Sequence, residues 1–143
     1  MTVQAIPYMR KTVSDYLREH PDVAEITNRV VSNPPSGRST PWIRVRRLDA
    51  PNATNAQVEH LVAFLMQFDC YAGAENGAPE ADRLGRTVRA ALVDMPGTHG
   101  DAVVTGTSIV GDIDLPDADG FEPARDRVIL TARIWAHARQ EEP

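Results

Sequence analysis

The sequence has one cysteine, one lysine and no apolar run of membrane-spanning length. A lone cysteine cannot form an internal disulfide, and Cys70 falls inside an apolar stretch, so we expect a small buried side chain and a reducing compartment. The first eleven residues, MTVQAIPYMRK, lack the apolar core of a signal peptide. We therefore expect a product made in the cytoplasm, with no membrane partner.

Aromatic residues are also scarce, at 6% of the chain, which argues against an aromatic-rich all-β module. The hydrophobic fraction of 42% and the charged fraction of 24% are ordinary for a globular protein. A length of 143 residues predicts one domain over 1–143, large enough for its own core. The net charge of −5 gives no electrostatic reason to expect general binding to nucleic acid.

Motifs for catalysis are missing as well. No glycine-rich segment opens a helix after a strand, so nucleotide binding has no support. His99 and Asp101 follow a Pro-Gly turn with no nucleophile beside them, and turn residues are the simpler interpretation. The loop DIDLPDADGFEP contains part of a calcium-binding pattern, but the first and last ligand positions do not match it. We expect no catalytic residue, metal site or cofactor.

The chain is organised around His60–Ala72, HLVAFLMQFDCYA, its longest apolar run. Alternate residues from His60 to Cys70 line one face and are mostly apolar, while Gln67, Asp69 and Tyr71 lie on the other face toward the C-terminal end, which predicts a central strand with one buried face and one partly wet face. Trp42–Leu48 alternates Ile43 and Val45 with polar or larger residues. Because only one loop separates these two segments, we expect an antiparallel pair.

Two amphipathic helices accompany the strands. Apolar residues recur at helical spacing between Ile6 and Leu17, and again between Ala81 and Met95. Gly85, inside the second helix, indicates a close approach of two backbones. Further strands are expected at about Arg29–Ser32, at Ala102–Ile113 and at Arg125–Ala138. The predicted class is α+β, a mainly antiparallel sheet with two amphipathic helices packed on one face.

This layout resembles the tail-terminator, or tail-completion, proteins of long-tailed bacteriophages. The segments that carry the likeness are LREHPDVAEI, NRVVSNPPSG, TPWIRVRRL, LVAFLMQFDCYAG, EADRLGRTVRAALVDM and RDRVILTARIWAHA. The resemblance implies a structural virion protein of the tail and neck, without catalysis. Its implied form is a homo-oligomer, a hexameric ring that caps the completed tail tube, binds the tail-tube protein and a head-side connector or stopper, and lets DNA pass without sequence-specific contacts.

Two other classes remain open at this point. One is another neck or tail protein, such as a head-closure or stopper protein or a tail-tube subunit, since these small phage proteins share much of the same hydrophobic pattern. The other is a small α+β ligand-binding domain or enzyme that uses a cavity between helices and sheet. Binding to tube ends would separate a terminator from the first class. A dry, filled core would exclude the second class.

The family has no sharp motif, so site residues come from charge and loop patterns. Basic residues crowd one predicted strand and acidic residues crowd one predicted loop without a compensating base, which predicts a subunit interface formed by Arg44, Arg46, Arg47, Asp112, Asp114, Asp117 and Asp119. Solvated faces are the alternative. Two long loops, Asn33–Pro41 and Gly111–Pro123, are predicted to dock partners through Pro34, Pro35, Arg38 and Phe121.

Overall fold

The computed structural model describes residues 5–32, 41–50, 61–73, 77–115 and 126–139. The helices in this part are α1 (Met9–Glu19), α2 (Pro21–Ile26) and α3 (Gly77–Val93). The strands are β1 (Val30–Val31), β2 (Trp42–Asp49), β3 (Val62–Tyr71), β4 (Gly97–His99), β5 (Ala102–Asp114) and β6 (Arg127–Ala138). None of the described helices is long and apolar enough to cross a membrane.

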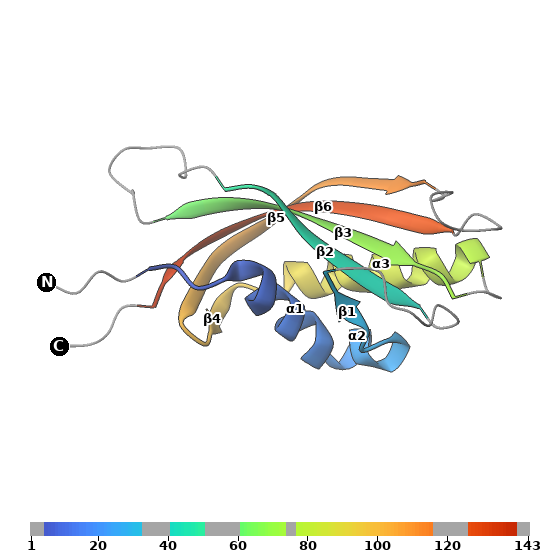
Figure 1. Cartoon of the computed structure of the whole chain (residues 1–143), viewed down its shortest axis with the longest axis horizontal. Coiled ribbons are helices and arrows are strands. Elements are labelled where there is room, and N and C mark those ends of the chain that lie inside the picture. The colour runs from blue at the N-terminus through green and yellow to red at the C-terminus, as the bar shows by residue number, and fades with distance from the viewer. Residues whose placement is uncertain (1–4, 33–40, 51–60, 74–76, 116–125, 140–143) are drawn as a thin grey trace, which may run out of the picture.

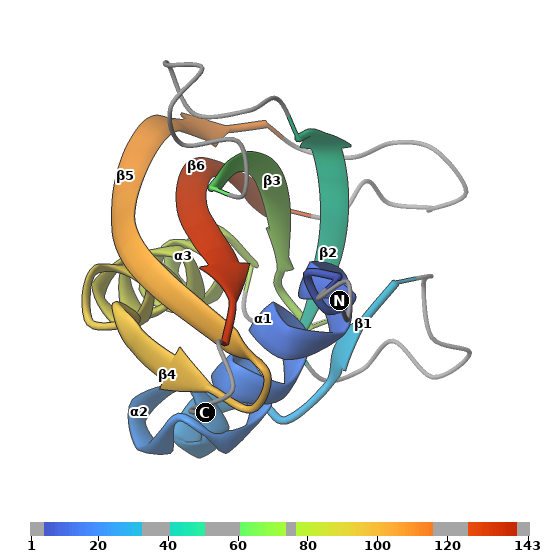
Figure 2. The ribbon, with the colours of Figure 1, turned by 90° about the vertical axis from the view of Figure 1, so that its left-hand side faces the viewer.

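The described strands form one six-stranded sheet in the order β1-β2-β3-β6-β5-β4. Its pairings are antiparallel except for the parallel contact between β1 and β2. All the helices lie on one face of the sheet, which curves over them (Figures 1 and 2). The predicted class is therefore confirmed, as is the antiparallel pairing of β2 with β3.

Two elements differ from the expectation of two helices and five strands. Residues 21–26 form a separate helix, α2, because Pro21 suits a first helical turn and the His20 ring accepts a hydrogen bond from Asp22 N. The residues expected to be a turn include β4, which pairs with the start of β5. The turn itself is only Gly100–Asp101, where Gly100 has a φ of +58°.

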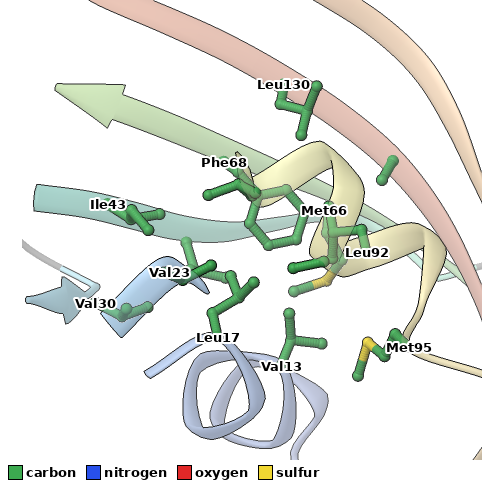
Figure 3. Close-up of a cluster of buried hydrophobic side chains, with 14 of the residues drawn as sticks. Val13, Leu17, Val23, Val30, Ile43, Met66, Phe68, Leu92, Met95 and Leu130 are labelled. Carbon is green, nitrogen blue, oxygen red and sulfur yellow. The ribbon is translucent and has the colours of Figure 1, made fainter. Parts of the chain in front are cut away.

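The core lies between the helices and the concave face of the sheet (Figure 3). The predicted alternation places Phe64, Met66, Phe68 and Cys70 of β3 on this face, and all four are buried. Helix α1 adds side chains at four-residue spacing, and α3 adds the whole predicted stripe. The helical contributions are Met9, Val13, Leu17, Ala81, Leu84, Val88, Ala91 and Leu92, followed by Met95 just after α3.

The opposite face of β3 is drier than predicted. Asp69 and Tyr71 were expected on a partly wet face, but both are buried. Trp42, expected on the polar side of β2, is also buried, because its ring stacks on Tyr71 with centroids 3.9 Å apart. The helix-free face of the sheet therefore carries its own buried cluster at one end.

Helix α3 comes very close to β6 at Gly85. A Cβ atom added to Gly85 would lie 2.8 Å from Val128 Cγ1. The predicted close approach is confirmed, although the neighbour is a side chain and not a second backbone. Valine is stiff about χ1, so Val128 cannot easily turn away from an added methyl group.

We expect Gly85→Ala to lower the free energy of unfolding by up to about 2 kcal/mol, because an overpacking cost of about 1–3 kcal/mol outweighs the gain in helix propensity of about 1 kcal/mol. Urea titration measures the change. Gly111→Ala is the control, since a Cβ there would meet nothing within 4 Å. In a Val128→Ala background the Gly85→Ala substitution should cost little, and an equal cost in both backgrounds would contradict the steric explanation.

Candidate assembly surfaces

The predicted basic cluster lies on β2, but its three arginines have different surroundings. Arg46 Nη2 donates to Asp69 Oδ2 at 2.7 Å, and Arg44 Nε donates to the Ser32 carbonyl oxygen at 3.2 Å. Arg47 is exposed and forms no ion pair with any described residue. Arg47 is consequently the member of the cluster that is most available to a second chain.

Asp69, expected on a partly wet face of β3, is instead a buried partner of this basic cluster. Its side chain is 0% exposed, and besides Arg46 it has Arg127 Nη1 at 3.7 Å and accepts from Gln67 Nε2 at 2.7 Å. A buried carboxylate is tolerated only when it is paired and hydrogen-bonded. The group therefore ties β2, β3 and β6 together on the helix-free face.

The acidic cluster is only partly within the described residues. Asp112 and Asp114 lie in β5 and not in a loop, and Asp112 Oδ2 accepts from Arg89 Nη1 of α3 at 3.2 Å. The expectation that these carboxylates lack an internal partner is therefore wrong for Asp112. Asp114 is exposed, and Asp117 and Asp119 lie outside the described residues.

The predicted docking residues Pro34, Pro35, Arg38 and Phe121 also lie outside the described residues. The residues that flank the two loops are described, and strand register brings them to one end of the sheet. Trp42 pairs with Tyr71, Tyr71 pairs with Arg127, and Leu115 N donates to the Arg127 carbonyl oxygen at 2.9 Å. The residues after loop 33–40 and those on both sides of loop 116–125 thus lie at the same end, beside the Trp42–Tyr71 stack (Figure 1).

At the opposite end, an open groove of about 590 Å³ runs between α1 and the β4–β5 turn. It includes His99 and Asp101, the pair considered above for acid/base chemistry. His99 Nε2 lies 2.6 Å from the Met95 carbonyl oxygen, and its ring packs edge-on against Tyr16. These contacts make His99 part of the structure that joins β4 to α1 and α3. No three described His, Cys, Asp or Glu side chains form a metal-binding group.

The buried ion group gives a direct stability test. Asp69→Ala should lower the free energy of unfolding by about 3–5 kcal/mol, because it leaves arginines next to a buried site without their counter-charge. Asp82→Ala is the matched control, since its pair with Arg86 is exposed and should matter by about 0–1 kcal/mol. Similar urea midpoints for the two variants would show that the Asp69 group does not hold the strands together.

Comparison with known proteins agrees with this architecture. One chain of a solved structure, the virion of a native gene transfer agent particle, has the same fold, with a TM-score of 0.68 and 15% identity. The match covers 90% of this chain and 94% of that chain. No curated protein matches the sequence. The family model described as tail completion protein gp17 matches residues 11–137. The chain therefore belongs to the tail completion protein gp17 family and is a structural protein of the bacteriophage virion tail.

Proposed function

We propose that this protein is the tail terminator, a ring that caps the completed tail tube and joins it to the head-side connector. The observation that carries the proposal is the family match over residues 11–137, nearly the whole chain. The gene transfer agent virion match adds that a chain of this fold occurs in an assembled particle. The ring is a homo-oligomer of six copies, with the tail-tube protein and a connector or stopper protein as its partners.

Two features of the molecule suit a ring component between two partners. The sheet has two distinct ends, one with the anchors of both long loops and one with the groove beside α1. Buried apolar side chains pack between the helices and the sheet in the described residues, which supports binding on outer surfaces over a ligand site at that position. Binding therefore takes place on outer surfaces.

We assign the loop end of the sheet to the contact with the tail tube or connector. Pro34, Pro35, Arg38 and Phe121 belong to the loops that leave the sheet beside Trp42, Tyr71 and Arg127. The described residues beside these loops form a packed anchor, in which Trp42 stacks on Tyr71 and the Arg127 guanidinium lies over the Tyr71 ring, and an anchor that is already ordered reduces the entropy lost on binding.

Charge complementarity between subunits is part of the same proposal. The predicted basic group (Arg44, Arg46, Arg47) lies on the β2 side of the sheet, and the described members of the acidic group (Asp112, Asp114) lie on β5, near the other side. In a ring each copy presents different surfaces to its two neighbours, so opposite charges on opposite sides meet around the whole circle. Arg46 pairs with Asp69 and Asp112 pairs with Arg89 within the subunit. We therefore expect Arg47 and Asp114 to contribute most to the contact between subunits.

Deleting residues 34–40 tests the docking assignment. The deletion should leave the urea midpoint nearly unchanged but abolish capping, so that purified tails carry overlong tubes that fail to join heads. Electron microscopy of tail length, together with infectivity, provides the measurement. The control is a shortening of the segment between β2 and β3, residues 52–58, which is expected to leave tails capped. Tails of normal length and full infectivity from the first deletion would refute the assignment.

Binding of the purified protein to tubes separates the terminator from its structural relatives. A terminator should bind only at tube ends and at a small fixed copy number, because the ring closes on one cross-section of the tube. Labelled protein mixed with tubes assembled without it can be counted by fluorescence microscopy. Binding along the tube, or incorporation into it, would instead indicate a tube subunit.

A further inference from the structure

Both sides of the sheet end in strand edges that are free over part of their length. In the described residues β4 pairs only with Ala102–Val104 of β5, and β1 pairs only with Ile43 and Arg44 of β2. The rest of β5 and the stretch 45–49 of β2 have a strand neighbour on one side alone. Free edges are the places where one sheet meets another chain. Figure 2 shows β2 and β5 on opposite sides of the sheet.

Each free edge carries one bulged aliphatic residue. The β2–β3 register shifts between Arg47 and Asp49, which leaves Leu48 without a partner, and Leu48 is 49% exposed. The β5–β6 register shifts between Ile109 and Gly111, which leaves Val110 without a partner, and Val110 is 52% exposed. A single exposed aliphatic residue is common on protein surfaces. Two such residues in equivalent positions on opposite edges are a more specific feature.

Strand register places the two bulges within about one residue of the same height along the sheet, roughly 3 Å. Following pairs across the strands, Val45 is level with Asp112 through Phe68 and Leu130. In the same way, Asp49 is level with Ser108 through Leu65 and Arg133. Between these rows Arg47 is level with Ile109, and the two bulges lie on either side of that row, Leu48 toward the Asp49 row and Val110 toward the Val45 row.

The similar height of the two bulges matters because a closed ring is generated by rotation without any translation along the axis. When the rotation axis runs along the strands, the edge of one copy meets its neighbour's edge at an unchanged height. β2 and β5 also run antiparallel to each other within the sheet, and such a rotation preserves that relation. The β2 edge of one copy and the β5 edge of the next can therefore meet side by side in a closed ring.

The charges beside the bulges are opposite in sign. Arg47, next to Leu48, is exposed and forms no ion pair with a described residue. Asp112 and Asp114 follow Val110, and Asp112 has only a partly exposed ion pair with Arg89. Asp49, the acidic residue of the β2 edge, accepts a hydrogen bond from Ala50 N through its own side chain. The β2 edge therefore offers a cation within two residues of the height at which the β5 edge offers Asp112.

We propose that the seam between neighbouring subunits joins these two edges, so that Leu48 of one copy packs against Val110 of a second copy while Arg47 reaches Asp112, two residues along the neighbouring edge. The proposal rests on the ring proposed above and names the surface that closes it. Because a bulge interrupts the regular ladder, side chains make the contact in place of a continuous intersubunit sheet. The same bulges protect the edges against open-ended strand pairing.

Engineered cysteines test the seam in assembled tails. The variant Leu48→Cys/Val110→Cys cannot form a bond within one chain, since its two positions are three strands, about 14 Å, apart. Native Cys70 does not compete, because it is fully buried and burial raises the pKa of its thiol. Tails assembled with the variant are oxidised, or treated with a short bismaleimide, and separated on denaturing gels. The controls are both single variants and Leu48→Cys/Thr98→Cys, whose second cysteine lies on β4.

We expect the double variant to give a ladder of covalent multimers up to the closed ring, while each control remains a monomer. Dimers from Leu48→Cys alone would overturn the proposal, because they would show like edges meeting. Tails that contain the double variant at normal copy number, are capped, and give no ladder would overturn the seam and leave the terminator function intact. Absence of the chain from purified tails would overturn both proposals.

Discussion

The structure depends on burying one face of a curved sheet beneath helices that all lie on the same side. β3 and β6 present long apolar faces, and α1 and α3 bring amphipathic stripes that match them. The close contact at Gly85 shows how tightly α3 is fitted to β6. Because the helices occupy only one face, the other face, both edges and both ends of the sheet are left for partners. An assembly protein needs several such surfaces on a rigid body.

The helix-free face is not simply a polar exterior. Asp69 is buried between arginines of two neighbouring strands, and the Trp42–Tyr71 stack closes the same end of the sheet. A charge removed from water is costly unless its partners are held in place, so this group makes the end of the sheet rigid. The residues that follow loop 33–40, and those on both sides of loop 116–125, lie there. A rigid anchor suits a surface that must bind partners in register.

The sequence predicted most of the fold because its signals were periodic. The alternation in β3 and β6 and the stripe of α3 follow from side-chain geometry alone. β4 was missed since its three residues, Gly97–His99, have no alternation and exist as a strand only through pairing with β5. The pairing of Asp69 with Arg46 was missed for the same reason. It depends on strand register, and an acidic residue in an apolar strand beside an arginine-rich strand was the one available hint.

The central claim is that this chain forms a single ring at the head-proximal end of the tail tube. Cryo-electron microscopy of purified virions, with the chain identified by a small fused tag, measures its position and copy number together. We expect one sixfold ring between the last tube layer and the connector, with the two loops near residues 41 and 126 directed at a partner. Density for the chain along the tube, or within the head, would contradict the claim.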